Sequence, residues 1–273
     1  MPNVLKGQVA IVTGAGRGFG RAIAKRFAAE GAAVAVTSRT QPQLDAVVAE
    51  ITAAGGRALA VAGDVISPRD VAKIVRATED AFGPLTLLVS NAGVPGPFGP
   101  IWLVDPEDWW ASQQVHIRAP LLYLRQVMPG MIERRAGRII IVSAIASRLV
   151  APYLSAYCVG KIAQTRITAE AAVEAKAHGV SVFAIDPGFV FTGLAEETLN
   201  SPDAQRWLPS MMERLRERRS DPNKDADLAR CAQRCVDLAS GRYDALTGRY
   251  FELPDDLDAL LREASAPPAE VHK

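Results

Sequence analysis

The stretch QVAIVTGAGRGFG, residues 8–20, decides how this chain folds. Its first part, Gln8–Val12, is a short apolar run that predicts a strand, and Arg21–Glu30 beyond it repeats alanine and isoleucine at helical spacing. Glycines between a strand and a helix let the backbone turn sharply, approach a pyrophosphate, and point the free amides of the helix start at the anion. Glycine-rich turns also join elements without binding anything, but this position favours a nucleotide site.

The alternation of strand and helix continues along the chain, and this order predicts parallel pairing of the strands. Further strands are expected at Ala33–Thr37, Arg57–Ala62, Leu85–Ser90, Gly137–Ser143, Val180–Ile185 and Arg249–Leu253, with helices at Pro42–Ala54, Pro68–Phe82, Pro106–Arg134, Ser155–His178 and around Lys224–Ala239. Continuous apolar strands such as Ile139–Val142 belong to sheets that helices cover on both faces. The expected fold class is therefore α/β, a single-domain Rossmann-like doubly wound parallel sheet with helices on both faces.

Length and composition favour one domain with a small-molecule substrate. The chain has 273 residues, 49% of them apolar, and a formal net charge of +1. Residues 1–273 are expected to form one dinucleotide-binding domain, with 189–223 as a lid over the substrate and 254–273 as a C-terminal extension. The small net charge gives no field that would gather nucleic acid or an anionic membrane surface.

Targeting segments and metal sites are not predicted. Met1–Gly7 lacks the basic region and apolar stretch of a signal peptide, and no apolar run is long enough for a membrane span, so a cytoplasmic location is expected. Cys231 and Cys235 are four residues apart, and Cys158 has no cysteine or histidine pattern near it. Neither a disulfide framework nor a zinc site is indicated, and small buried thiols are expected.

The residues after the second strand indicate which dinucleotide binds. Sites for NAD usually place an acidic residue there, whereas this chain has Ser38 and Arg39. A guanidinium can hold a 2′-phosphate, and Arg17 in the glycine turn can approach the same group, so NADP(H) is preferred over NAD(H). The alternative is that both arginines are solvated surface residues. Asp64 is placed either to contact the adenine or to cap the helix near Pro68.

Tyr157 and Lys161 lie four residues apart near a helix start and project from one face. A tyrosine titrates near ~10 and is a poor base at neutral pH unless a nearby positive charge favours its ionised form. Lowering that pKa by about three units needs roughly 4 kcal/mol, which a desolvated lysine and an oxidised nicotinamide can supply together. The pair alone is weak evidence for a catalytic site, since a tyrosine and a lysine at this spacing also occur by chance.

Taken together, these residues resemble the short-chain dehydrogenase/reductase family, in its ordinary single-domain subgroup. The resemblance covers residues 6 to about 253 and rests on motifs at the carboxyl ends of strands and at helix starts. These are the Thr13–Gly20 turn, Asp64, Asn91-Ala92-Gly93, Ser143, Tyr157 with Lys161, Asp186-Pro187-Gly188 and Thr192. Without the family, Ser143 could be a cap and Asn91-Ala92-Gly93 a turn.

The resemblance implies roles for these residues in interconverting a ketone and a secondary alcohol. Tyr157 would give a proton to the substrate oxygen or remove it, Ser143 would hydrogen-bond that oxygen, and Lys161 would lower the tyrosine pKa and hold the nicotinamide ribose. The cofactor-binding residues implied are Gly14, Arg17, Gly18, Phe19, Gly20, Ser38, Arg39, Asp64, Val65, Asn91, Ala92, Gly93, Tyr157, Lys161, Pro187, Gly188, Val190 and Thr192. The alternatives are a redox-neutral dehydratase or epimerase, and a nucleotide-binding protein with little catalysis.

Three positions depart from the family pattern. His116 stands where the family has an asparagine that holds a water linking the lysine to solvent. An imidazole titrating near ~6.5 could carry protons itself, could displace the water and interrupt the proton path, or could be a buried residue without a chemical role. Our hypothesis is the first: His116 serves in the proton path. Gly160 stands where small polar residues are usual, and Asp186 replaces an asparagine. Neither removes a group that the reaction needs.

The remaining features concern surfaces. Trp109 and Trp110 are adjacent, so they face different directions on a helix and predict packing or a subunit contact. The helices Pro106–Arg134 and Ser155–His178 carry more apolar side chain than one sheet face absorbs, and in the family they form a dimer interface, so a homodimer or homotetramer is expected. The charged run Glu213–Arg219 predicts a solvated lid face, or Arg214 or Arg218 could reach an anionic substrate.

Overall fold

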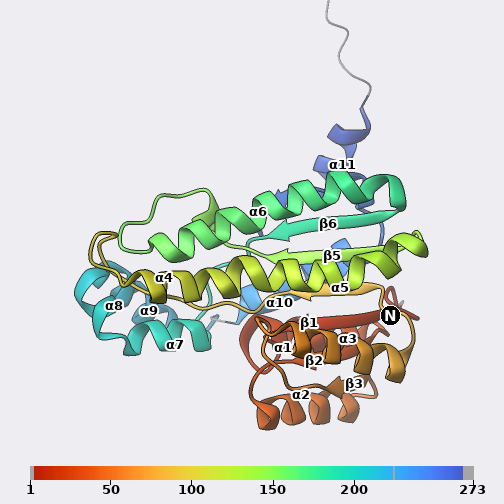
Figure 1. Cartoon of the computed structure of the whole chain (residues 1–273), viewed down its shortest axis with the longest axis horizontal. Coiled ribbons are helices and arrows are strands. Elements are labelled where there is room, and N and C mark those ends of the chain that lie inside the picture. Colours follow the sequence, from red (N-terminus) through yellow and green to blue (C-terminus); the bar gives the residue numbers. More distant parts are fainter. Residues whose placement is uncertain (1–2, 224, 267–273) are drawn as a thin grey trace, which may run out of the picture.

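The computed structural model describes residues 3–223 and 225–266, and its seven strands form one parallel sheet (Figure 1). The strands are β1 Val9–Thr13, β2 Ala33–Thr37, β3 Arg57–Ala60, β4 Leu87–Ser90, β5 Gly137–Val142, β6 Val180–Ile185 and β7 Tyr250–Phe251. Their order in the sheet is β3-β2-β1-β4-β5-β6-β7, and every neighbouring pair is parallel. The order reverses direction between β1 and β4, which is where doubly wound sheets bind ligands. The predicted fold class is confirmed.

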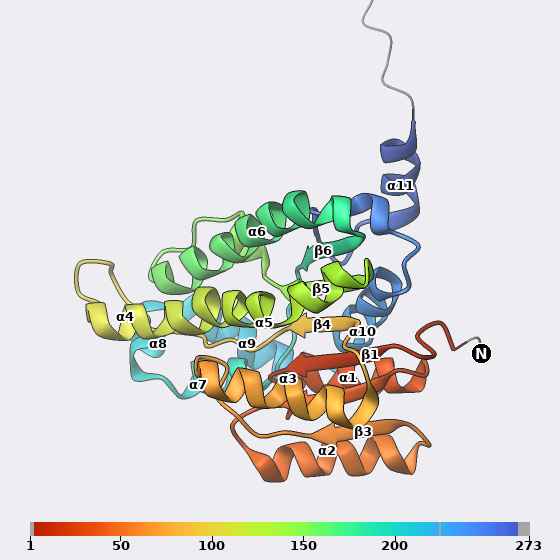
Figure 2. The same cartoon turned by 45° about the vertical axis from the view of Figure 1, so that its right-hand side comes forward.

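The helices divide between the two faces of the sheet. They are α1 Gly18–Ala29, α2 Gln41–Ala53, α3 Pro68–Phe82, α4 Pro106–Gln113, α5 Ala119–Glu133, α6 Ser155–Ala175, α7 Gly193–Asn200, α8 Pro202–Trp207, α9 Pro209–Ser220, α10 Ala226–Ala239 and α11 Leu257–Ser265. One core packs α1, α2 and α10 against the sheet, and the other packs α3, α5 and α6 against the opposite face. In both views α5 and α6 lie side by side (Figures 1 and 2).

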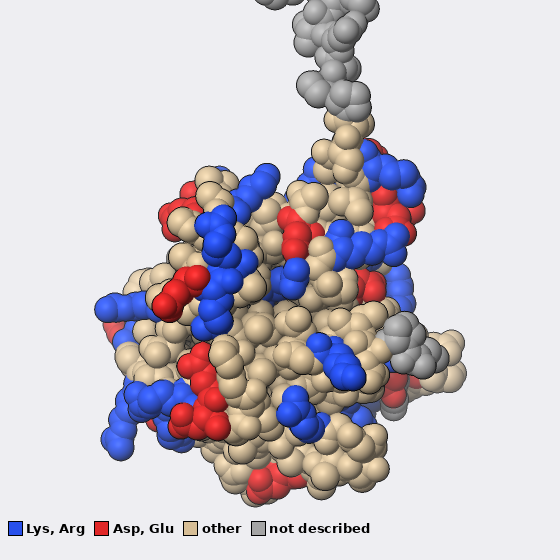
Figure 3. All heavy atoms as spheres, turned by 90° about the vertical axis from the view of Figure 1, so that its right-hand side faces the viewer, with Lys and Arg blue, Asp and Glu red and all other residues tan. Residues whose placement is uncertain are grey.

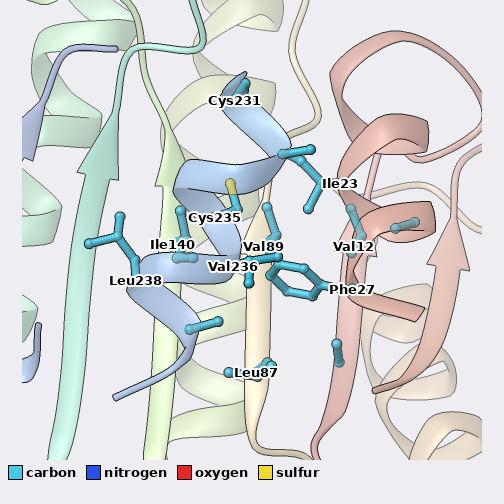
Figure 4. Packing of buried hydrophobic residues seen from close by; sticks show 14 of the residues in the cluster. Val12, Ile23, Phe27, Leu87, Val89, Ile140, Cys231, Cys235, Val236 and Leu238 are labelled. Atoms are coloured by element: carbon cyan, nitrogen blue, oxygen red, sulfur yellow. The ribbon is translucent and has the colours of Figure 1, made fainter. Parts of the chain in front are cut away.

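The alternation of side chains along the strands explains the two cores. In β5, Ile140 points to the first core and Ile139 to the second, so a continuous apolar strand serves both faces. Figure 4 shows the first core, where Phe27 of α1 and Val236 of α10 meet over the strands. Cys231 and Cys235 are buried there as free thiols, in agreement with their predicted packing role.

Local signals fix where the helices begin. The Ser67 hydroxyl accepts from the Asp70 amide at 3.2 Å, and Pro68 occupies the first turn of α3, where no amide donor is needed. Ser67 is therefore the cap of α3, and the alternative that Asp64 caps this helix is wrong. Asp64 instead accepts from the Ile66 amide at 3.1 Å in a local turn.

Two predicted elements differ from the structure. The expected helix Pro106–Arg134 is interrupted by a π-helical turn, Gln114–Arg118, which separates α4 from α5. The strand predicted at Arg249–Leu253 is only Tyr250–Phe251, because it pairs solely with Ala184 and Ile185 at the end of β6. Of the remaining expectations, Lys224 and residues 267–273 of the C-terminal extension lie outside the described residues.

The carboxyl ends of the strands define the functional edge. The arrowheads of the strands point toward the end of the molecule where α4 and α7–α9 gather (Figure 1). Figure 3 shows the opposite end, over which basic and acidic side chains are interspersed. Among the described residues, no helix combines the length and the apolar character needed to cross a membrane.

Candidate active site

The glycine turn packs against the loop after β4. The Thr13 hydroxyl accepts from the amides of Asn91 at 2.9 Å and Ala92 at 3.1 Å. The Asn91 side chain donates to the Thr13 carbonyl at 2.8 Å, so it joins the two loops. A Cβ on Gly14 would come 3.0 Å from Ala92 Cα, and one on Gly20 would come 2.6 Å from Asn91 Nδ2. Glycine is required here because the loops touch through their backbones.

The start of α1 fits the phosphates of a dinucleotide. The first amides of a helix have no partner within it, no side chain caps this end, and its first turn carries no acidic residue. The side chain of Phe19, in the first turn of α1, packs on the first core. Gly18 has a φ of 56°, and a Cβ there would come 3.2 Å from Thr192 at the start of α7. The predicted residues of both segments therefore meet.

The basic residues predicted for the 2′-phosphate lie at the same edge. Arg39 is exposed and makes no ion pair among the described residues, and Ser38 accepts from the Thr40 amide at 3.3 Å. A Cβ on Gly16 would come 3.2 Å from the Ser38 hydroxyl, so Ser38 borders the turn. Arg17 turns toward the lid and pairs with Glu197 of α7, a contact that the sequence analysis missed.

The remaining cofactor residues line the ends of β3 and β6. Val65, next to Asp64, is buried with 9% exposure. Gly188 has a φ of 88°, and a Cβ there would come 2.7 Å from Leu253, so only glycine fits after Pro187. Val190 is buried at 6% exposure beside them. The sheet thus brings the predicted segments of five loops, those after β1, β2, β3, β4 and β6, to one edge.

Tyr157 and Lys161 share one face of α6, as their spacing predicts. The Lys161 ammonium lies 5.5 Å from the centroid of the Tyr157 ring. It donates to the Val142 carbonyl at 2.9 Å and to Gln164 Oε1 at 3.1 Å, and its residue is only 4% exposed. Gln164 was not predicted, although its position three residues after Lys161 places it on the same helix face.

Burial dominates the titration of this pair. It lowers the pKa of Lys161 to about 7, and the negative charge of Asp186, which raises this pKa, offsets only part of the effect. It also raises the pKa of Tyr157 above its ordinary value, and the negative charge of Asp186 adds to this rise. In the protein without its cofactor, Lys161 therefore does not offset the effect of burial on Tyr157, and the expected lowering of the tyrosine pKa by lysine and oxidised nicotinamide together stays a prediction.

Ser143 lies at the end of β5 with its hydroxyl engaged. The hydroxyl donates to the Lys161 carbonyl at 3.0 Å, and the residue is 1% exposed. This bond ties the end of the strand to α6, the helix that carries Tyr157 and Lys161. Ser143 would have to leave it before it could donate to a substrate oxygen.

His116 occupies the π-helical turn and contacts Tyr157. Its ring meets the tyrosine ring edge to face, with centroids 5.6 Å apart, and its Nε2 donates to the Val94 carbonyl at 3.0 Å. Burial, together with the nearby Lys161 charge, lowers the pKa of His116 to about 3. The imidazole is therefore neutral, and its buried Nδ1 has no partner among the described residues. A Cβ on Gly160 would come 2.6 Å from His116 Cβ, so the departures at 116 and 160 are linked.

The region 189–223, expected from the sequence to be a lid, packs apolar side chains on the tyrosine. Met212 and Leu215 of α9 belong to a buried cluster against which Tyr157 packs. Arg218 pairs with Asp221 at 2.5 Å and Asp227 at 3.0 Å, and Arg214 stacks over the Phe189 ring. Trp109 donates to Ser155 while Trp110 is exposed, so the two indoles face different surroundings as predicted.

Comparisons with known proteins agree with this site. A family model described as short chain dehydrogenase matches residues 8–203. A short chain dehydrogenase from Pseudocercospora fijiensis is 39% identical over 268 residues, covering 95% of this chain and 84% of the relative. A 3-oxoacyl-(acyl-carrier-protein) reductase from Synechocystis sp. is 34% identical, covering 75% of this chain and 83% of the relative. A metagenomic short-chain oxidoreductase solved with NADP is 38% identical with a TM-score of 0.65, covering 68% of this chain and 85% of that one.

Proposed function

The chain belongs to the short-chain dehydrogenase/reductase family, and we propose that it is an NADP(H)-dependent oxidoreductase that interconverts a ketone and a secondary alcohol. The observation that carries the proposal is the stacking of Tyr157 and Lys161 on α6, at the sheet edge that also holds the glycine turn. When bound there, the cofactor supplies or accepts the hydride at the carbonyl carbon.

Tyr157 acts as the acid and base. Because burial raises its pKa, the phenol is protonated at neutral pH, which is the form that gives a proton to a ketone oxygen during reduction. During oxidation the phenolate oxygen of Tyr157 takes a proton from the alcohol. This direction needs added positive charge to stabilise the phenolate. Lys161, with a pKa of about 7, supplies that charge at neutral and lower pH.

His116 has a positioning role in this proposal. With a pKa of about 3 the imidazole stays neutral at neutral pH and keeps its one proton on Nε2 toward Val94, which disfavours a shuttle through an imidazolium. Its edge-to-face contact and its bond to Val94 instead hold Tyr157 relative to the loop after β4. Ser143 contributes through its bond to the backbone of Lys161.

The preference for NADP(H) rests on charge. The free guanidinium of Arg39 and the absence of an acid at Ser38 suit a 2′-phosphate, and Arg17 can join them by leaving Glu197. Arg39→Asp is expected to raise the KM for NADPH at least tenfold while changing that for NADH little. Equal losses for both cofactors would contradict the preference.

The proposal extends to assembly and location. Trp110, Leu121, Ile162 and Val173 are large exposed apolar residues on α4, α5 and α6, so a homodimer or homotetramer would bury them. Light scattering after size exclusion tests this, and a monomer at working concentration would contradict it. The free cysteines suit a reducing compartment such as the cytoplasm. The α7–α9 helices are proposed as the substrate lid.

Replacing Tyr157 by phenylalanine tests the chemistry. Following reduced-nicotinamide absorbance with a panel of ketones, we expect Tyr157→Phe to lower kcat by about 100-fold to 10,000-fold. Its affinity for NADPH, measured by fluorescence, should stay close to wild type. Turnover retained in the folded variant would reject the proposal. Cofactor binding without any substrate-dependent change would favour a redox-neutral enzyme or a binding protein.

A further inference from the structure

The surroundings of Tyr157 describe the substrate as well as the reaction. A cluster of apolar side chains from α8, α9 and two loops, here called the lid cluster, packs around the tyrosine. Its members include Phe98, Leu154, Leu208, Met211, Met212 and Leu215. A substrate whose oxygen reaches Tyr157 must place the rest of its body among these side chains.

The arginines of this region border the cluster but do not belong to it. Arg206, Arg214 and Arg219 are exposed, and each stacks on one aromatic ring. The ring partners are Trp207 at 4.6 Å, Phe189 at 5.0 Å and Phe191 at 5.5 Å. Arg218 is held by two aspartates and the Phe189 carbonyl. Each of these guanidinium groups already has a partner within the protein, which gives no support to the expectation that Arg214 or Arg218 receives an anionic substrate.

An aromatic pair closes the cluster on the side of α8. The rings of Tyr153 and Trp207 are tilted by 34° with centroids 5.4 Å apart. Tyr153 has a φ of 67°, which is uncommon for a residue with a side chain, and its carbonyl accepts from the Gly99 amide at 3.0 Å. The backbone is thus held in an unfavourable conformation that directs the tyrosine ring onto α8.

Given the proposed function, we infer that the substrate is an uncharged, mainly apolar ketone whose hydrocarbon part replaces contacts within the lid cluster beside Tyr153 and Trp207. A carboxylate in this place would lose its hydration among apolar side chains, and the guanidinium groups that border the cluster are already stacked on rings or paired with aspartates, so the exchange is unfavourable. An apolar chain would keep the contacts that the cluster already makes.

Two ketones of equal chain length, octan-2-one and 7-oxooctanoate, test the inference. With NADPH in excess, kcat/KM for octan-2-one should exceed that for 7-oxooctanoate by at least about 100-fold. Equal values, or a preference for the carboxylate, would overturn the inference. If neither ketone is turned over, the proposed function fails, and binding decides the inference separately. Binding can then be measured by the quenching of Trp207 fluorescence, after subtracting the signal of the Trp207→Phe variant. Octan-2-one should quench this fluorescence and 7-oxooctanoate should not.

A charge placed inside the cluster gives a matched comparison. Met211 is half-buried in the cluster, whereas Ser210 beside it is exposed. Met211→Arg should narrow the ratio of the two kcat/KM values at least tenfold, because the new guanidinium can pair with the carboxylate. Ser210→Arg adds the same charge outside the cluster and should leave the ratio unchanged. The same narrowing in both variants would show that the lid's overall charge, and not its apolar interior, sets the preference.

Discussion

Replacing Gly160 by alanine should harm catalysis more than stability. The added Cβ would lie 2.6 Å from His116 Cβ and 2.8 Å from its Cγ. Packed carbon atoms prefer about 3.5–4.0 Å. Because His116 Cβ is fixed to the backbone, rotation of the side chain cannot relieve the contact. The π-helical turn and α6 must therefore separate by about 1 Å.

The expected magnitudes follow from two opposing effects. Overpacking of this kind typically costs about 1–3 kcal/mol, and alanine in place of glycine inside a helix gains about 1 kcal/mol. The free energy of unfolding should thus fall by no more than about 2 kcal/mol. Tyr157 and Lys161 flank the glycine on the same helix, and a shift of about 1 Å in reacting groups can cost about 100-fold in rate. We expect kcat/KM to fall by about 10-fold to 100-fold.

Urea unfolding and initial rates of NADPH oxidation measure the two effects separately. Gly130→Ala is the control, because Gly130 lies inside α5 and its added Cβ would meet only the end of the Arg134 side chain, at 3.0 Å from Nη1, where a small rotation relieves the contact while Nη2 keeps its bond to the Leu85 carbonyl. This variant should keep its rate and lose no stability. If Gly160→Ala behaves like the control, with full activity and a gain near 1 kcal/mol, the proposed close packing of α6 on His116 is refuted.

Three further variants test individual groups. Ser143→Ala should lower the free energy of unfolding by about 1 kcal/mol, because it loses the hydrogen bond to the Lys161 carbonyl. It should lower kcat less than tenfold. A 1,000-fold loss of kcat would mean that the hydroxyl binds the substrate. Lys161→Met tests the lowered pKa of Lys161, which is about 7 in the folded protein against 10.5 for a free lysine. Because the unfolded chain alone binds the proton between these values, wild type should gain stability over the variant as pH rises from 7 to 9, by at most about 1.4 kcal/mol per pH unit, and a constant difference in urea unfolding would contradict this. His116→Asn should remove an acid sensitivity, since the folded pKa of about 3 lies below the ordinary 6.5. As pH falls from 6.5 to 5, the free energy of unfolding of wild type should fall relative to that of the variant, by up to about 1.4 kcal/mol per pH unit. Equal falls in the two proteins, measured by urea unfolding, would reject the prediction.

The fold could be predicted from sequence because its signals are local. Ser67 followed by Pro68 marks the start of α3, and apolar runs mark each strand. Similar signals were present in the lid, where Ser201 caps α8 with Pro202 in its first turn, but the lid was expected only as one irregular stretch. The interruption of the long helix was not predictable, because it depends on how His116 fits between elements that are distant in the sequence.

The positions of the site residues were predictable, but the partners of their polar groups were not. Motif order places Tyr157, Lys161 and the glycine turn at one edge of the sheet, since the carboxyl ends of parallel strands meet there. Arg17 finds its partner in Glu197, which is 180 positions away, and only the folded lid brings the two together. The rise of the Tyr157 pKa in the protein without cofactor could not be predicted either, because burial depends on packing that spacing does not reveal.

The departures at 116 and 160 form one structural unit rather than two independent changes. His116 is enclosed by Gly160 of α6 and by Gly93 after β4, whose added Cβ would come 3.3 Å from the imidazole Cε1. Its Nε2 donates to the Val94 carbonyl, so the same ring spans the π-helical turn, the loop after β4 and the helix of the catalytic pair. A side chain added at 160 would therefore press on His116, and the size of residue 116 limits what position 160 can hold. This coupling explains why a histidine at 116 occurs with a glycine immediately before the catalytic lysine.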